Sequence, residues 1–125
     1  MNNKVLIGPS TFAALDSSPA DKLIDAGFEI VNNPFGRKLT VKELINLLPG
    51  INGIIAGLED LNRVVMEGSN LRVISRCGSG LSNVDLKAAE SLGIKVLSTP
   101  DGPTTSVAEL TVGLLLSMIR SLYKM

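Results

Sequence analysis

The fold is decided by residues 72–89, which read RVISRCGSGLSNVDLKAA. A short β-branched run at Arg72–Ser75 indicates a strand, and the glycine-containing loop after it leads into a helical stretch at Leu86–Ser91. Asp85 stands before that stretch as a helix-capping residue, and Gly93 follows it as a helix stop. The segment is therefore predicted to form one strand–loop–helix unit.

The same unit occurs five times along the chain. We predict strands at Lys4–Gly8, Glu29–Asn32, Gly53–Ala56, Arg72–Ser75 and Lys95–Leu97, and helices at Pro19–Ala26, Val41–Leu48, Leu61–Glu67, Leu86–Ser91 and from Val107 onward. Further helix signals are Ser18 before Pro19, Thr40 with Glu43, and the stops Gly27 and Gly50. Strands joined through helices run parallel with right-handed crossovers. The sequence thus predicts an α/β fold with a flavodoxin-like, doubly wound parallel five-stranded sheet of order 2-1-3-4-5.

The last stretch, Ser106–Met125, is predicted to be a helix with a capping box formed by Ser106 and Glu109. Its apolar side chains cover nearly every face, so we expect it to be buried. The apolar run Val112–Ile119 is far shorter than the roughly 20 residues that span a bilayer, which argues against a membrane partner. The helix is expected to pack against a second domain or a second copy of the chain.

The composition limits the function. The 125 residues suit one domain, and the 12 basic and 12 acidic residues cancel, with only one tyrosine and three phenylalanines to stack on bases, so nucleic acid is not expected as a partner. One cysteine and a short apolar start predict a cytoplasmic protein. The chain contains no histidine, the commonest general acid or base and metal ligand. We therefore expect neither a metal site nor a self-sufficient enzyme.

The loop Gly78–Asn83 has the first two glycines of a dinucleotide-binding fingerprint but Asn83 at the third, and no acidic residue follows the next strand. We therefore do not expect it to bind a nucleotide. Two glycines one residue apart suit a bend whose backbone N–H groups hold a carboxylate or phosphate. The alternative is a tight turn in which Asn83 and Asp85 bond the backbone.

Several neighbours of that loop have a functional and a structural interpretation. The Arg76 guanidinium can bind an anionic substrate through two N–H groups, or it can hydrogen-bond carbonyl groups and acidic side chains of the protein itself. Without a histidine to activate it, Cys77 is expected to be a small buried side chain rather than a nucleophile. Glu59 and Asp60 are expected to favour the start of the helix at Leu61 rather than act as general acids. The segment Thr99–Thr105 is expected to form a cleft wall.

These motifs together resemble a known family. The stretches Asn33–Arg37, Leu71–Ala89, Gly93–Val96, Thr99–Pro100 and Ser106–Thr111 occur in the order found in the amino-terminal part of D-isomer-specific 2-hydroxyacid dehydrogenases, especially those of the D-3-phosphoglycerate dehydrogenase kind. The resemblance covers essentially the whole chain. It implies a substrate-binding domain of an enzyme that passes hydride between NAD and a 2-hydroxy or 2-oxo acid.

The resemblance also implies roles for individual residues. The loop that matches Ser79 and Gly80 offers backbone amides to the substrate carboxylate. Two positions depart from the family: Pro103 stands where an asparagine is frequent, so that Thr104 is its expected replacement, and Ser82 stands where an aspartate or asparagine is common. The substrate-binding residues implied here are Arg76, Ser79, Gly80, Leu81 and Thr104.

We therefore expect a substrate-binding domain at 1–105 and an interdomain or dimerisation helix at 106–125. The nucleotide-binding domain and the catalytic arginine, acidic residue and histidine are expected to be absent from this chain, which then binds no cofactor and is inactive alone. The alternative is a non-catalytic domain that associates with itself through Ser106–Met125. A receiver domain or a flavodoxin would share the fold, but Gly8–Thr11 offers neither acidic residues nor a phosphate loop after the first strand.

Overall fold

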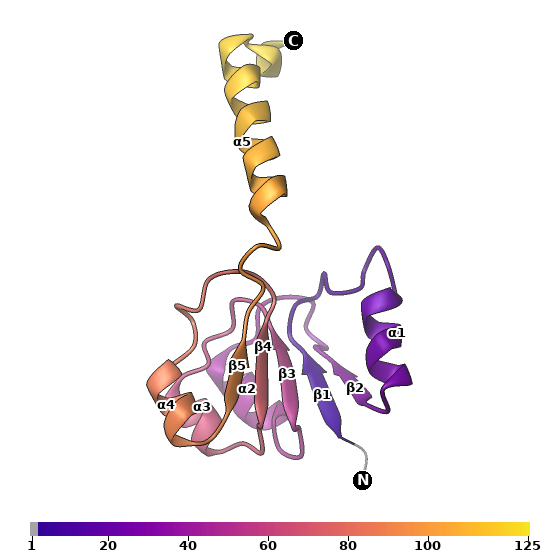
Figure 1. Cartoon of the computed structure of the whole chain (residues 1–125), viewed down its shortest axis with the longest axis vertical. Helices are drawn as coiled ribbons and strands as arrows, with labels where there is room; N and C mark the ends of the chain where they lie inside the picture. Colours follow the sequence, from indigo (N-terminus) through magenta and orange to yellow (C-terminus); the bar gives the residue numbers. More distant parts are fainter. Residues whose placement is uncertain (1–2) are drawn as a thin grey trace.

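The structure, a computed structural model, describes residues 3–125 and contains one five-stranded parallel sheet of order β2-β1-β3-β4-β5. The strands are β1 (Lys4–Ile7), β2 (Glu29–Asn32), β3 (Gly53–Ala56), β4 (Val73–Arg76) and β5 (Lys95–Leu97). The helices are α1 (Ser18–Asp25), α2 (Val41–Leu47), α3 (Arg63–Glu67), α4 (Leu86–Ser91), α5 (Thr104–Ile119) and the 3₁₀ turn η1 (Leu122–Lys124). The predicted fold class and strand order are confirmed (Figure 1).

The core lies between the central strands and the helices α2, α3 and α4. Leu6, Ile54 and Ile74 sit at one level of β1, β3 and β4 and are fully buried. Leu44 of α2 and Met66 of α3 belong to the same buried cluster. Along β3 and β4, buried side chains alternate with half-buried ones, so one face of each strand lies against the core.

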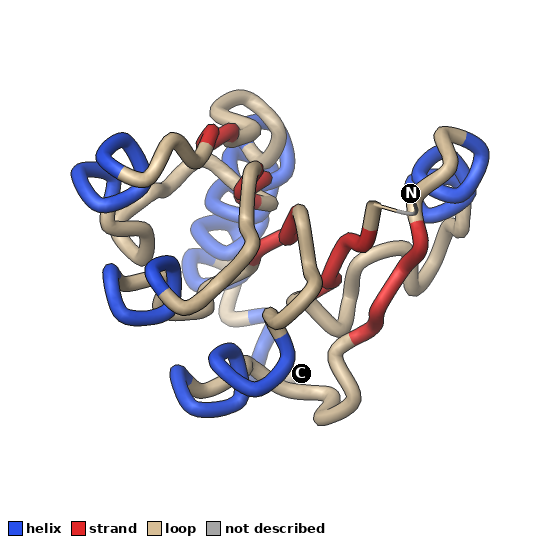
Figure 2. The backbone as a smooth tube through the Cα atoms, turned by 90° about the horizontal axis from the view of Figure 1, so that it is seen from below, coloured by secondary structure: helices blue, strands red, loops and turns tan. Residues whose placement is uncertain are grey.

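Helix α1 lies apart from the other helices, next to β2 at the end of the sheet (Figure 2). It contains no buried residue, and the strand beside it is only half-buried. This part of the sheet therefore contributes little to the core.

The predicted signals fix several helix ends, but the predicted cap at Ser18 is wrong, because α1 already includes Ser18 and Ser17 occupies the cap position. Thr40 and Glu43 form the expected capping box of α2, and the Asp85 side chain accepts a hydrogen bond from the Ala88 N–H at 3.0 Å. The stops Gly27 and Gly50 have φ angles of 86° and 78°, which glycine adopts without strain.

Helix α3 starts later than predicted. The side chain of Asn62 accepts a hydrogen bond from the Val65 N–H at 3.1 Å and begins the helix at Arg63. Leu61 stays outside the helix, fully buried, and pairs with Val84 in an isolated parallel bridge. The prediction of a helix from Leu61 is therefore wrong by two residues, because a core side chain and a capping residue are adjacent there.

Helix α5 starts earlier than predicted, at Thr104, with Pro103 before it and no side-chain cap. The predicted capping box of Ser106 and Glu109 is wrong, because Ser106 already lies in the first helical turn. The helix extends from the carboxyl edge of the sheet like a rod and contacts only η1 among the other elements (Figure 1). Its apolar side chains are exposed over its whole length. Within residues 3–125, no helix combines the length and the hydropathy needed to cross a membrane.

Candidate functional site

A cavity of about 430 Å³ lies at the carboxyl ends of the central strands. Its lining comes from the loops that follow β1, β2, β3 and β4, and consists of Gly8, Pro9, Ser10, Thr11, Arg37, Lys38, Gly57, Leu58, Glu59, Arg76 and Cys77. Ligands of doubly wound sheets bind at this edge. A second cavity of about 520 Å³ lies beside α1, is lined by Leu23 and Phe28 among others, and contains none of the predicted site residues.

Glu59 is the most deeply buried charged residue of the cavity, with 2% of its surface exposed. Its Oε2 accepts a hydrogen bond from the Gly57 N–H at 2.5 Å. Gly8 leaves room for the carboxyl group, since a Cβ at that position would lie 2.9 Å from the carboxyl carbon. The expectation that Glu59 favours the start of a helix is wrong, because α3 begins only at Arg63 and the side chain turns into the protein.

The other oxygen of Glu59, Oε1, has no hydrogen-bond donor among residues 3–125. In the same part of the chain, no fully enclosed polar side-chain atom lacks a partner. Oε1 is therefore not enclosed, and since Glu59 lines the cavity, this oxygen opens into it.

Arg76 lines the same cavity and is 9% exposed. Its Nε donates to Oδ1 of Asn83 at 3.4 Å, and its Nη1 donates to the Cys77 carbonyl. Within the described part of the chain, Nη2 has no acceptor, and none of the ion pairs joins Arg76 to Glu59. The cavity thus contains a buried cation and a buried anion that do not neutralise each other.

Asn83 connects these two groups. Its Nδ2 donates to the carbonyl oxygens of Gly57 at 3.0 Å and Glu59 at 2.7 Å, while its Oδ1 accepts from Arg76. The interpretation of this loop as a turn in which Asn83 and Asp85 bond the backbone is confirmed. That role does not compete with anion binding, because it uses side chains and leaves the amides of the loop free.

The glycine loop itself lies next to the cavity lining. Ser79 and Gly80 are exposed and Leu81 is half-buried, and their backbone N–H groups have no acceptor among residues 3–125. Gly78 ties the loop to the next one, because its N–H donates to Thr99 Oγ1 and its carbonyl accepts from the Thr99 N–H, both at 2.9 Å.

Of the predicted site residues, the structure therefore places only Arg76 in the cavity lining. Thr104 is exposed at the first position of α5, where the segment that begins at Thr99 enters the helix. Binding of substrate by Ser79, Gly80, Leu81 and Thr104 stays a prediction.

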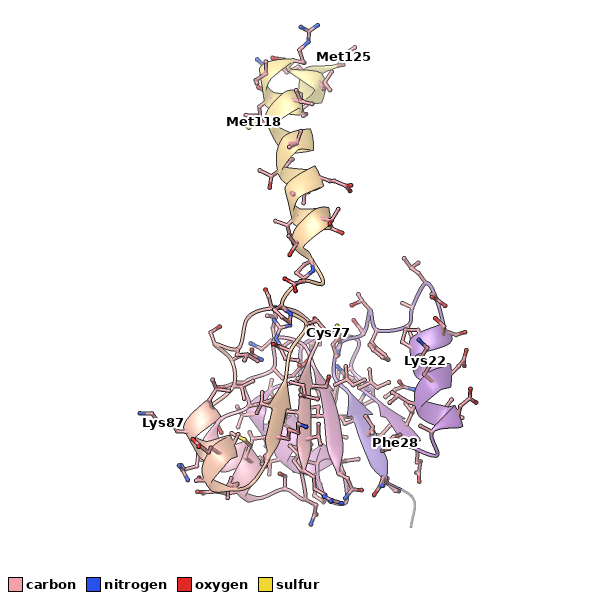
Figure 3. The ribbon with its side chains drawn as sticks, in the orientation of Figure 1. Lys22, Phe28, Cys77, Lys87, Met118 and Met125 are labelled. Carbon is pink, nitrogen blue, oxygen red and sulfur yellow. The ribbon has the colours of Figure 1, made fainter. Side chains whose placement is uncertain are left out.

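Cys77 does not have the predicted buried side chain. It is exposed at the carboxyl edge of the sheet below α5 and lines the cavity (Figure 3). Side chains alternate along the end of a strand, so the inward orientation of Arg76 turns Cys77 outward.

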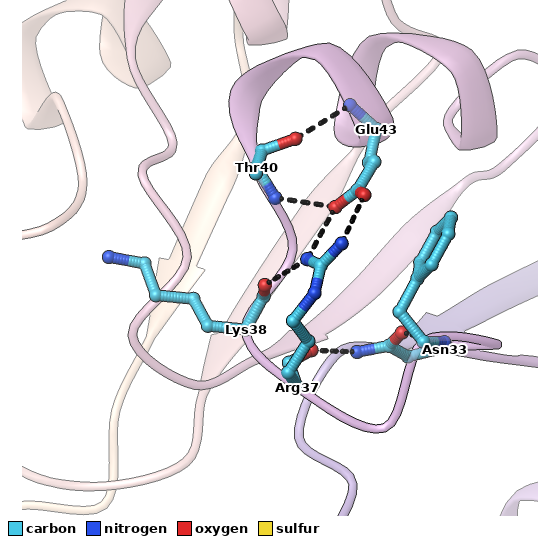
Figure 4. Close-up of polar contacts among 6 residues, drawn as sticks. Asn33, Arg37, Lys38, Thr40 and Glu43 are labelled. Carbon is cyan, nitrogen blue, oxygen red and sulfur yellow. Dashed lines mark hydrogen bonds and ion pairs between the residues drawn. The ribbon is translucent and has the colours of Figure 1, made fainter.

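Two further cations, Arg37 and Lys38, line the cavity from the loop after β2. The Arg37 guanidinium binds both carboxyl oxygens of Glu43, at 2.7 Å and 3.0 Å (Figure 4). This pair and the backbone N–H of Thr40 lower the pKa of Glu43 from 4.5 to about 2. Lys38 takes part in none of the ion pairs formed by residues 3–125, so its charge remains available at the rim.

The described residues do not fit a dinucleotide. In the glycine loop, the position that a third glycine would leave open is filled by Asn83, whose side chain is bound to Gly57, Glu59 and Arg76. The cavity beside it is small and contains a buried carboxylate, which would repel a pyrophosphate. Binding of NAD is therefore not assigned to these residues.

The fold and the cavity together define a doubly wound α/β domain with three cations and one buried carboxylate at the ligand-binding edge of its sheet. Residues 11–119 match the catalytic domain of the D-isomer specific 2-hydroxyacid dehydrogenases. The chain belongs to this family and corresponds to its catalytic, substrate-binding domain.

Individual relatives agree with this assignment. The D-3-phosphoglycerate dehydrogenase of Sus scrofa is 36% identical over 121 residues, which are 95% of this chain and 21% of that protein. The hydroxypyruvate reductase of Thermotoga maritima is 38% identical over 80 residues, or 62% of this chain and 26% of that protein. Among solved structures, the TT0316 protein of Thermus thermophilus superposes with a TM-score of 0.84 at 31% identity, covering 97% of this chain and 38% of that one. The chain thus spans only about a fifth to a quarter of the two curated relatives.

Proposed function

We propose that this chain is the substrate-binding part of an NAD-dependent oxidoreductase that acts on the CH–OH group of a D-2-hydroxy acid. The observation that carries the proposal is Arg76, a buried guanidinium with a free Nη2 that faces a cavity at the carboxyl edge of the sheet. A guanidinium held in place by Asn83 presents its N–H groups in a fixed direction, which suits a carboxylate.

The glycine loop supplies the second element of the proposed site. The N–H groups of Ser79, Gly80 and Leu81 lack acceptors among residues 3–125, and consecutive free amides of this kind bind carboxylates and phosphates. We propose that the substrate carboxylate lies between Arg76 and these amides. Thr104 is proposed to contribute its hydroxyl from the start of α5.

Hydride transfer needs a nucleotide-binding domain, which supplies the NAD and the remaining catalytic groups. We propose that residues 106–125 pack against such a domain or against a second copy of this chain, and that residues 1–105 alone form the substrate domain. The support is the exposed apolar surface of α5, which has no partner among the described elements. A cytoplasmic location is supported by the exposed thiol of Cys77, since reducing compartments preserve free thiols.

The same surface supports a second candidate function, a non-catalytic domain that associates with itself through α5. The two candidates differ in ligand binding, because a self-associating domain needs no affinity for hydroxy acids or oxo acids.

An NMR titration of the ¹⁵N-labelled chain with hydroxypyruvate and D-glycerate tests the proposal. We expect saturable shifts of the Ser79 and Gly80 amides and of the Arg76 side chain. The variant Arg76→Lys should weaken binding by about tenfold, because an ammonium cannot form two parallel bonds to a carboxylate. Arg72→Lys, at the opposite end of β4 in the cavity beside α1, is the matched control and should bind normally. Shifts that do not saturate, or equal affinity of the Arg76→Lys variant, would contradict the assignment.

A further inference from the structure

The carboxyl group of Glu59 is unusually placed for a buried charge. It has a single hydrogen bond, from the Gly57 N–H, and no cation among residues 3–125 pairs with it. A buried carboxylate normally acquires several donors or a cation, because it loses its hydration on burial. Oε1 opens into the cavity, so a molecule bound there can supply the donor that the protein does not.

We propose that Glu59 determines substrate specificity by accepting a hydrogen bond from a hydroxyl on the carbon next to the reacting one, and that it rejects substrates with a phosphate at that place. The proposal rests on the proposed function, since it assumes that the substrate carboxylate binds at Arg76. It assigns the two unpaired charges of the cavity to opposite ends of one small molecule.

The depth of Glu59 separates this hydroxyl from the reacting one. Glu59 lies on the cavity floor, whereas Ser10, Thr11 and Lys38 are exposed at the rim. The reacting carbon must remain accessible to a hydride donor that approaches from outside, so it cannot lie on the floor. The group that reaches Glu59 is therefore the remote end of the substrate.

Charge decides which remote groups fit. A hydroxyl donates to Oε1 and supplies the missing partner, whereas a phosphate has only acceptors and negative charge to offer. A phosphate brought next to the buried carboxylate of Glu59 is therefore repelled, because like charges repel strongly where burial limits their screening by solvent. The free cation Lys38 is exposed at the rim, where solvent screens it, and Arg37 is already neutralised by Glu43. Neither offsets the repulsion at the floor.

The test measures the affinity of the full chain for three acids by NMR titration. D-glycerate has the remote hydroxyl, D-lactate lacks it, and 3-phospho-D-glycerate carries a phosphate in its place. We expect D-glycerate to bind about tenfold or more tightly than either of the others, because a site built around a hydrogen bond rejects analogues that cannot make it.

The variant Glu59→Gln removes the charge and keeps an acceptor for the Gly57 N–H. It should reduce the ratio of the affinities for D-glycerate and 3-phospho-D-glycerate by about tenfold. Asp60→Asn, which removes the same charge from the exposed neighbour, is the matched control and should leave this affinity ratio unchanged.

The outcomes separate the two proposals. Binding of 3-phospho-D-glycerate as tight as that of D-glycerate overturns the role of Glu59 but leaves the proposed function standing. Equally tight binding of D-lactate and D-glycerate also overturns the role of Glu59 and leaves the proposed function standing. Binding of none of the three acids overturns the proposed function, and the role of Glu59 with it. The comparison of the three acids on the unaltered chain decides the question even if Glu59→Gln does not fold.

Discussion

The side chain of Asn83 accepts a hydrogen bond from Nε of Arg76 at 3.4 Å and holds that guanidinium at the cavity. The same side chain donates to the carbonyl oxygens of Gly57 and Glu59. One residue of the loop after β4 therefore fixes both the position of the buried cation and the path of the chain next to the buried anion. The spacing between the two charges depends on this bridge.

Replacement of Asn83 by alanine should weaken both stability and ligand binding. The change leaves the carbonyls of Gly57 and Glu59 and the Nε of Arg76 without partners, and an unsatisfied buried group costs about 1–3 kcal/mol. Urea denaturation should show a loss in this range. The exposed neighbour provides the control, since Ser82→Ala should change the free energy of unfolding by less than about 0.5 kcal/mol. Equal stability of the two variants would mean that the bridge is dispensable.

Substitution of two glycines of the loop should affect the stability of the chain differently. Gly80 has open space around its Cβ position, so Gly80→Val should leave stability within about 0.5 kcal/mol of the unaltered chain. If the amides there hold a carboxylate, the valine should weaken binding of 2-oxo acids in an NMR titration.

Gly78, in contrast, has a φ of 134°, and a Cβ there would collide with Nη1 of Arg76. Gly78→Ala should destabilise the chain by about 1–3 kcal/mol, measured by urea denaturation.

For the other variant, Gly80→Val, undiminished binding of an oxo acid would remove the loop amides from the proposed site.

The ion pair between Arg37 and Glu43 predicts a pH effect with a definite sign. The folded chain lowers the pKa of Glu43 from 4.5 to about 2, so the carboxylate form favours folding. This contribution is fully present above about pH 4.5 and is lost as the pH falls through about 2. A ¹³C NMR titration of the side-chain carboxyl groups should show it directly.

The substitution Arg37→Gln should raise the pKa of Glu43 toward its ordinary value, because the guanidinium is the largest cause of the shift. Arg63→Gln, which removes the cation of the separate pair with Glu67, should leave the Glu43 titration unaltered. A Glu43 titration that is the same in all three proteins would mean that the pair does not form in solution.

The sequence predicted the strand order because strands joined through helices cross over with one handedness. It predicted several helix ends because those depend on local signals. Thr40, Asp85 and the glycine stops act on residues a few positions away, so they are readable from spacing alone. Arg76 was selected as a candidate site residue for a related reason, since it comes after a β-branched run at the edge where ligands bind, and the structure places it in the cavity lining.

The burial of Glu59 was not predictable in the same way. The sequence places it beside Asp60, ahead of an apolar run, as a helix-start residue would be. Its burial depends on Gly8, 51 positions earlier, which leaves room for the carboxyl group, and on Asn83, which binds the backbone of its loop. The one available signal was the glycine that directly follows β1, at the edge where the other strands also end.

The exposed apolar surface of α5 predicts self-association of the chain when no other domain covers it. Leu110, Leu114 and Leu115 are each more than half exposed, and soluble monomers rarely expose a continuous patch larger than a few hundred Å². Sedimentation of the purified chain should therefore show a dimer or a higher oligomer. Leu115→Asp should shift it toward monomer, because a buried carboxylate without a partner opposes association. Leu86→Asp places the same change on the exposed surface of α4 and should leave the oligomer intact. A monodisperse monomer of the unaltered chain would contradict self-association through α5. If Leu86→Asp dissociated the oligomer as much as Leu115→Asp did, the interface would not be specific to α5.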